Sequence, residues 1–325
     1  MIPPKLKTGD TICVVSPSTS LAVIQAETRQ VAGENLTGLG LQVNFGRNAE
    51  ALDRSHSSSI EQRLADLHAA FADPQINGLL TAIGGYNCNQ LLSYLDFDLI
   101  RQHPKILCGY SDITALGNAI YARTGLVTYS GPHFSTFGMR LGLGYTLEHF
   151  RKCLMEDGPF DVAPSETWSD DAWYRDQEQR EFLPSPGYLV INEGQAEGRL
   201  VGGNLCTFNL LQGTPYMPSL ENTILMLEDD SESRAQHFDR DLQSLLHLPG
   251  FEGVRALVIG RFQKASQIDD ETLVEIIYSK RALRRLPVIA QANLGHTTPQ
   301  LTFPIGGRAR LAADAGQVSF TITEH

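Results

Sequence analysis

The sequence lacks an excess of positive charge. It carries 26 lysines and arginines against 37 aspartates and glutamates, a formal net charge of −11 at pH 7. Because a nucleic-acid backbone is bound by clustered positive charge, this balance predicts that nucleic acid is not a partner. It also argues against a cationic surface that would hold the protein on a membrane.

Long apolar runs and paired cysteines are missing as well. The apolar run from Ile12 to Val15 is far too short to cross a bilayer, and Pro3 and Pro4 stand where a signal peptide needs its apolar core. We therefore expect a cytoplasmic protein with no membrane partner. The cysteines are odd in number and form no C-x-x-C pair, which predicts buried reduced thiols and no zinc site. They are Cys13, Cys88, Cys108, Cys153 and Cys206.

The first half of the chain alternates short β-rich runs with helical patterns. This alternation, with nearly continuous apolar strands, predicts an α/β fold with a parallel sheet covered on both faces. The expected strands are 11–18, 41–46, 77–85, 105–111 and 126–132, and the expected helices are 21–39, 59–71, 89–95, 112–123 and 146–156.

The second half is more mixed and follows a polar, proline-punctuated stretch at 161–188 that contains both tryptophans. We expect strands at 197–204, 222–230, 255–262 and 286–296, helices near 234–247 and 270–283, and a final hairpin turning at Asp314-Ala315-Gly316. At 325 residues the chain is long for one core. The predicted division is a parallel-sheet domain at 1–163, a linker with an aromatic loop at 164–188, and a smaller β-rich α/β domain at 189–325.

A serine stands at an abrupt strand-to-helix corner in "KILCGYSDITAL". Ligands of a parallel sheet gather at the carboxyl ends of its strands, so a hydroxyl at this corner is well placed for chemistry. The next N–H, at a helix N-terminus, can stabilise an oxyanion. Ile113 replaces the closing glycine of the G-x-S-x-G elbow, so Ser111 is either a nucleophile or only a helix cap.

A second strand end carries two adjacent glycines in "TAIGGYNCNQ". The free backbone N–H groups of Gly84 and Gly85 can complete an oxyanion hole, cradle a phosphate or simply form a tight turn. The pattern is not G-x-G-x-x-G, so a dinucleotide cofactor is weakly supported.

A serine nucleophile needs a base, and the base needs an acid to orient it. Glu228, which ends the strand "ILMLEDD", and His296, in the glycine-flanked loop "ANLGHTTPQ", would supply these groups in the chain order Ser…Glu…His. His133, in "SGPHF" at another strand end, is the rival base. Glu228 with Asp229 and Asp230 is alternatively a metal site or a solvated strand end.

Six ordered motifs resemble the LD-carboxypeptidase family of serine peptidases and cover nearly the whole chain. That family includes cytoplasmic murein tetrapeptide carboxypeptidases and the microcin C self-immunity proteins. The motifs are "PPKLKTGDTICVVSPS", "IGGYNCNQLLSYLDFDLI", "PKILCGYSDITAL", "GRLVGGNL", "ILMLEDD" and "GHTTPQLTFPIG".

The resemblance implies a role for each candidate residue. It implies Ser111 as nucleophile, His296 as general base and Glu228 as triad acid, with oxyanion donors at the backbone N–H groups of Asp112 and Gly85. It further implies a flavodoxin-like N-terminal domain, a β-rich C-terminal domain, a triad assembled between them, a homodimer, and no metal or other cofactor.

The long segment with "WSDDAWYRD" resembles the microcin-immunity branch, in which a tryptophan stacks on the adenine of a peptidyl or aminoacyl adenylate. Trp173, or less favourably Trp168, would take that role here, unless the ring only packs the loop. The expected activity is amide hydrolysis on a small peptide or a peptidyl or aminoacyl nucleotide. The alternatives are removal of the terminal D-alanine of murein tetrapeptide, a non-catalytic ligand-binding protein, and a metal hydrolase.

Overall fold

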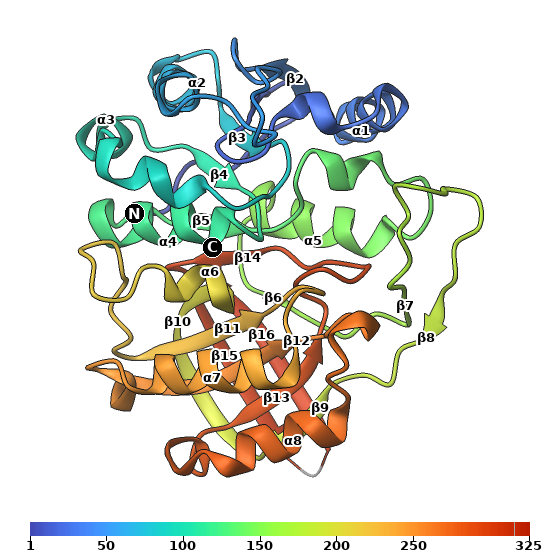
Figure 1. Cartoon of the computed structure of the whole chain (residues 1–325), viewed down its shortest axis with the longest axis vertical. Coiled ribbons are helices and arrows are strands. Elements are labelled where there is room, and N and C mark those ends of the chain that lie inside the picture. The colour runs from blue at the N-terminus through green and yellow to red at the C-terminus, as the bar shows by residue number, and fades with distance from the viewer. Residues whose placement is uncertain (315) are drawn as a thin grey trace.

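Two β-sheets with their helices occupy opposite ends of the long axis of the computed structural model (Figure 1). The structure describes residues 1–314 and 316–325. No helix in this described part of the chain is both long enough and apolar enough to cross a membrane.

The first sheet has five parallel strands in the order β2-β1-β3-β4-β5, with β14 added antiparallel at the β5 edge. This order is that of a flavodoxin-like sheet, so the predicted α/β class is confirmed. Strands β3 to β5 are wholly buried, whereas edge strand β2 is largely exposed. The strands are β1 (Thr11–Val15), β2 (Gln42–Phe45), β3 (Gly78–Thr81), β4 (Ile106–Cys108), β5 (Thr128–Ser130) and β14 (Phe303–Ile305).

Helices connect these strands near the predicted positions. The expected helix 21–39 is divided, because Ile24 and Gln25 are extended and separate a 3-10 turn at Leu21–Val23 from α1. The expected helix 89–95 is a 3-10 turn at Cys88–Tyr94. The helices are α1 (Ala26–Gly38), α2 (Ile60–Ala72), α3 (Phe97–Gln102), α4 (Ile113–Thr124) and α5 (Gly144–Leu154), and a further 3-10 turn lies at Ser135–Gly138.

The second sheet is mixed and runs in the order β6-β16-β15-β10-β11-β12-β13-β9. Its four central strands, β10 to β13, are parallel, and antiparallel strands flank them on both sides. The strands are β6 (Phe160–Asp161), β9 (Leu189–Asn192), β10 (Gly194–Asn204), β11 (Thr223–Glu228), β12 (Val254–Gly260), β13 (Val288–Ala292), β15 (Arg308–Asp314) and β16 (Gln317–Glu324).

Short helices accompany this second sheet. They are α6 (Leu205–Asn209), α7 (Ala235–Leu246) and α8 (Asp270–Ser279), with 3-10 turns at Phe251–Gly253, Lys264–Ser266 and Arg281–Leu283. The segment before β9 adds a two-stranded ribbon, β7 (Thr167–Trp168) with β8 (Leu183–Pro184). Strands β15 and β16 pair as the predicted hairpin, but Ala315 of the predicted turn lies outside the described residues.

The two sheets exchange segments across the predicted boundaries. Strand β14 comes from the second half of the chain and joins the first sheet, and β6 comes from the first half and joins the second. The division at 163 and 189 therefore stays a prediction.

Helix α4 is tied directly to strand β10 of the other sheet. Asn118 Nδ2 donates to the carbonyl of Gly202 at 2.8 Å, and the N–H of Gly202 donates back to Asn118 Oδ1 at 3.2 Å. The N–H of Asn204 donates to Thr114 Oγ1 at 3.0 Å. Because these groups are buried, each hydrogen bond would be costly to break, and together they fix α4 against β10.

Candidate active site

Ser111 lies at the corner between β4 and α4 in a strained backbone conformation. Its φ angle is 57°, in the left-handed region that side chains other than glycine rarely adopt. A side chain at Gly109 would collide with Thr81, because its Cβ would lie 2.1 Å from Thr81 Oγ1. The sequence thus needs glycine two residues before the serine for the chain to turn here.

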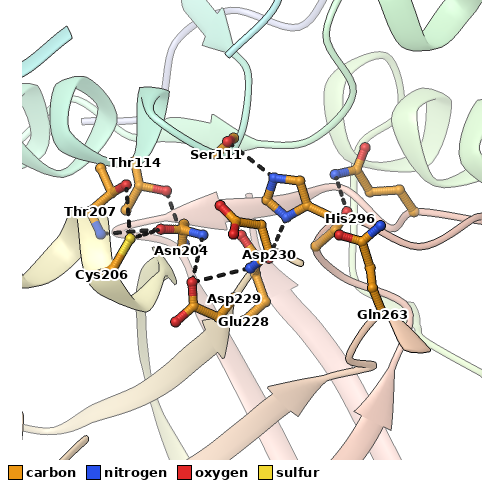
Figure 2. Close-up of polar contacts among 12 residues, drawn as sticks. Ser111, Thr114, Asn204, Cys206, Thr207, Glu228, Asp229, Asp230, Gln263 and His296 are labelled. Atoms are coloured by element: carbon orange, nitrogen blue, oxygen red, sulfur yellow. Dashed lines mark hydrogen bonds and ion pairs between the residues drawn. The ribbon is translucent and has the colours of Figure 1, made fainter. Parts of the chain in front are cut away.

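The Ser111 hydroxyl faces the second sheet and does not cap its own helix. The N-cap residue of α4 is Asp112 and not Ser111, and the Asp112 side chain makes no capping hydrogen bond. Ser111 Oγ lies 3.1 Å from His296 Nε2 (Figure 2). This geometry therefore argues against Ser111 being only a helix cap.

His296 stands between Ser111 and Glu228, as Figure 2 shows. Its Nδ1 lies 2.8 Å from Glu228 Oε2, at the end of β11, while its Nε2 faces the serine. The Glu228 side chain is 3% exposed and the His296 side chain 18% exposed. The structure therefore joins hydroxyl, imidazole and carboxylate from three distant parts of the chain in one hydrogen-bonded row.

The surrounding negative charges raise the pKa of His296. Burial by itself lowers its pKa, but the charge of Glu228 and its hydrogen bond, together with Asp230 and Asp229, raise the pKa above its usual value. A carboxylate held against an imidazole favours the protonated ring, which is the state a general base reaches after it takes a proton.

Asp112 uses its carboxylate to hold neighbouring loops. Its Oδ2 accepts hydrogen bonds from the hydroxyl of Ser18 and, at 2.8 Å, from the N–H of Cys88. Burial raises the pKa of Asp112, and these hydrogen bonds oppose the rise. The side chain thereby links the loop after β1 and the loop after β3 to the N-terminus of α4.

Gly85 follows β3 beside this corner. Its φ angle is 151°, and a Cβ there would lie 2.4 Å from both Ser18 Oγ and Thr19 Oγ1. The preceding residue, Gly84, is packed against Ser111, since a Cβ on Gly84 would lie 3.0 Å from Ser111 Oγ. The glycine pair therefore brings bare backbone close to the serine.

His133, the rival base in the sequence, lies apart from the hydrogen-bonded row. Its Nδ1 is 2.7 Å from Thr81 Oγ1, and its ring centre is 4.3 Å from that of Tyr110. Burial, with a smaller effect of His296, lowers the pKa of His133 to about 3. In the described part of the chain no hydrogen bond joins it to Ser111, so the geometry favours His296 as the base.

The three acidic residues at the end of β11 have different hydrogen-bond partners. Glu228 meets His296, while Asp229 Oδ1 accepts from Asn204 Nδ2 at 3.3 Å and from the N–H of Asp230 at 3.1 Å. Burial, aided by the charge of Glu228, raises the pKa of Asp229 to about 7. Among the described residues, no group of three or more histidines, cysteines or carboxylates is placed to hold a metal ion.

Asn204 and Thr114 are residues of the site that sequence reasoning missed. Asn204 Oδ1 caps α6 by accepting from the N–H of Thr207 at 3.1 Å, and Asn204 Nδ2 donates to Asp229. The backbone N–H of Asn204 donates to Thr114 Oγ1 (Figure 2). The only signal in the sequence was the position of the asparagine at the end of a strand, in "GRLVGGNL".

A cavity of about 620 Å³ opens above Ser111, and its wall includes Trp173 but not Trp168. The Trp168 ring instead packs against the guanidinium of Arg261, 4.9 Å from the ring centre. The loop that carries both rings is joined to the His296 loop, because Ser169 and Thr298 exchange backbone hydrogen bonds of 2.8 and 2.9 Å. Of the two tryptophans, Trp173 borders this cavity and Trp168 does not.

A hydroxyl, an imidazole and a carboxylate linked in this order form the arrangement that serine hydrolases use. The fold that carries it here is a flavodoxin-like sheet joined to a second, mixed sheet. The chain belongs to the LD-carboxypeptidase family: residues 12–131 match its N-terminal domain and residues 197–311 match its C-terminal domain.

Three relatives cover nearly the whole chain. The putative carboxypeptidase YocD of Bacillus subtilis is 55% identical over 99% of both chains. The microcin C7 self-immunity protein MccF of Escherichia coli is 33% identical over 98% of this chain and 94% of its own. A probable murein peptide carboxypeptidase of Bacillus subtilis is 30% identical over 95% of this chain and 91% of its own.

Solved structures match equally completely. An MccF-like protein from Bacillus anthracis superposes with a TM-score of 0.99 at 54% identity over all of both chains. MccF in complex with aspartyl sulfamoyl adenosine superposes with a TM-score of 0.90 at 30% identity, over 100% of this chain and 99% of the other. An active-site mutant of MccF that has a serine, an asparagine and a lysine replaced by alanine gives 0.89 at 30% identity, with the same coverage.

Proposed function

We propose that this protein is a serine peptidase with a Ser111–His296–Glu228 triad. The observation that carries the proposal is the continuous row of hydrogen bonds from the serine hydroxyl through the imidazole to a buried carboxylate. Membership of a carboxypeptidase family supports it independently.

In the proposed reaction, Ser111 Oγ attacks the carbonyl carbon of an amide while His296 Nε2 takes the hydroxyl proton. The negative charge that develops on the carbonyl oxygen is stabilised by the N–H groups of Asp112 and Gly85. His296 then gives the proton to the departing amine, and the C–N bond breaks. A water molecule, deprotonated by the same imidazole, hydrolyses the acyl-enzyme and restores the serine.

Glu228 contributes by orienting and stabilising the imidazolium that forms in both steps. Its nearly complete burial strengthens this effect, because water does not screen the pair. The strained backbone of Ser111 keeps its hydroxyl aimed at the base and out of the helix.

The proposed substrate is a small peptide or a peptidyl or aminoacyl nucleotide. MccF has been solved with aspartyl sulfamoyl adenosine, and a Trp-to-Phe variant of it with adenosine monophosphate. In this chain Trp173 lines the cavity above Ser111, where an indole face can stack on a purine. We therefore place the protein with the enzymes that give immunity to microcin-like antibiotics, acting in the cytoplasm as a homodimer.

The alternative substrate is murein tetrapeptide, from which the enzyme would remove the terminal D-alanine, since one relative is a probable murein peptide carboxypeptidase. A side-by-side assay on murein tetrapeptide and an aminoacyl sulfamoyl adenosine separates the two. Cleavage of the nucleotide analogue supports the proposed class, and cleavage of the tetrapeptide alone overturns it.

The mechanism is tested with Ser111→Ala, matched by Ser231→Ala, which removes another hydroxyl from the same cavity wall. Hydrolysis should fall by several orders of magnitude in the first variant and change little in the second. Substantial turnover by Ser111→Ala would rule out the triad. A fluorophosphonate probe tests the ligand-binding alternative: tight ligand binding without labelling of Ser111 would favour a non-catalytic protein.

A further inference from the structure

His133 is a buried histidine of the cavity that the proposed mechanism does not use. It follows β5, is 2% exposed, and lines the same cavity as Ser111 and His296. A buried imidazole needs a hydrogen-bond partner for each ring nitrogen.

The hydrogen bonds of Thr81 determine where the ring proton of His133 lies. Thr81 Oγ1 lies 3.3 Å from the carbonyl oxygen of Cys108 and 2.7 Å from His133 Nδ1. A carbonyl oxygen can only accept, so the single hydroxyl proton of Thr81 points to Cys108. Both hydrogen bonds then require that Nδ1 carries the proton and donates to Thr81, which leaves a lone pair on Nε2.

That lone pair faces the serine. Nε2 is buried and has no hydrogen-bond partner among the described residues. A Cβ built on Gly84 would lie 3.4 Å from His133 Nε2 and 3.0 Å from Ser111 Oγ, so both atoms pack closely against Gly84. A buried acceptor without a partner is unfavourable, and a hydrogen-bond donor would satisfy it.

The charges of the cavity wall are all of one sign. In the described part of the chain its lining includes four carboxylates, and neither lysine nor arginine. Asp171 is neutralised by Arg180 at 2.7 Å, but Asp170, Asp230 and Glu232 make no ion pair among the described residues. Asp170 accepts from Gln263 Nε2 at 3.0 Å and from the N–H of Lys264 at 2.6 Å. Within the described residues, the Asp230 carboxylate accepts only from the N–H of Glu232 at 2.8 Å, and the Glu232 carboxylate accepts from the Tyr86 hydroxyl at 2.6 Å.

This wall differs from that of MccF. An active-site mutant of MccF has a lysine among the residues replaced, and the protein has been solved with aspartyl and glutamyl sulfamoyl nucleotides, which carry an acidic side chain. No lysine of the described chain lines the present cavity. A carboxylate would therefore meet repulsion here, whereas an ammonium would meet uncompensated negative charge.

We propose that His133, Asp230 and Glu232 make this enzyme selective for substrates whose scissile carbonyl belongs to a residue with an ammonium side chain. Nε2 of His133 accepts a hydrogen bond from that ammonium, and the two carboxylates supply the opposite charge. The inference rests on the proposed function and names its substrate class.

The test compares kcat/KM for lysyl, glutaminyl and glutamyl sulfamoyl adenosine, which differ only in the aminoacyl side chain. The wild-type protein should prefer the lysyl over the glutamyl compound by about tenfold to a hundredfold, with glutaminyl between them. A glutamyl compound cleaved as fast as the lysyl one, or faster, overturns the inference and leaves the proposed function standing. If none of the three is hydrolysed and fluorophosphonate does not label Ser111, the proposed function fails and the inference with it.

Variants assign the selectivity to residues. Asp230→Asn with Glu232→Gln should bring the lysyl-to-glutamyl ratio close to one, and His133→Phe should lower it, while His133→Asn should restore part of it through its amide oxygen. Labelling of Ser111 by fluorophosphonate shows that each variant is folded. If His133→Phe does not fold, the Asp230→Asn/Glu232→Gln variant decides alone, and an unchanged ratio in it overturns the inference.

Discussion

Replacing Ser111 by glycine should abolish hydrolysis and yet give a more stable protein than replacing it by alanine. Both variants lose the hydroxyl and its contact with His296, so the difference between them isolates the backbone. The φ angle of 57° costs a residue with a side chain about 1–2 kcal/mol. Glycine loses about 0.5–1 kcal/mol more conformational entropy than alanine on folding, so the net advantage of Ser111→Gly is about 0.5–1 kcal/mol.

Urea unfolding of the two variants, followed by tryptophan fluorescence, measures this difference. With an m-value of about 3 kcal/mol/M, the glycine variant should unfold at a midpoint about 0.2–0.3 M higher. Equal midpoints, or a more stable alanine variant, would show that the corner is not strained. If the glycine variant is the more stable one, the wild-type protein holds its candidate nucleophile at the expense of stability. Each inactive variant serves as the folding control for the other.

Four further predictions follow from the site. Glu228→Gln should lower kcat by about 10⁴-fold with little change in KM, since the amide cannot stabilise the imidazolium, and an effect under tenfold would contradict its role. Because neutral His296 is the active form and its pKa is raised above 6.5, kcat/KM should fall as the pH drops through that raised value. Asp230→Asn removes a charge that raises this pKa, so the acidic limb of the pH profile should move to lower pH, and a shift to higher pH would reverse the assigned sign. Trp173→Ala should raise KM for a nucleotide substrate about tenfold or more, whereas Trp168→Ala should affect KM little, and equal effects would refute stacking by Trp173 alone.

The sequence predicts the first sheet well because its central strands β1, β3 and β4 are buried and mostly apolar. It predicts less well the pieces that join the two sheets. Strand β14 is three residues with a central proline, Phe303–Ile305, and no local pattern distinguishes it from a loop. Strand β14 pairs with β5, which lies far away in the sequence, and local periodicity carries no information about such a long-range pairing.

The candidate triad could be inferred because each member ends a strand or stands in a glycine-flanked loop. The contacts that position it could not, since Thr114 and Asn118 look like ordinary polar residues of a helix until β10 is packed against them. The sequence leaves the choice between Trp168 and Trp173 open for a related reason: the loop that carries them has no periodicity, and only the folded loop places Trp173 in the cavity wall.

Strand β14 lies directly after the His296 loop and is built into the sheet that carries Ser111. The ribosome must therefore synthesise the chain through residue 305 before the first sheet can be completed and the base brought to the nucleophile. A nascent chain that has emerged only as far as β13 contains the serine and the acid without the imidazole. If the proposed triad is correct, a fragment that ends before His296 should not hydrolyse substrate.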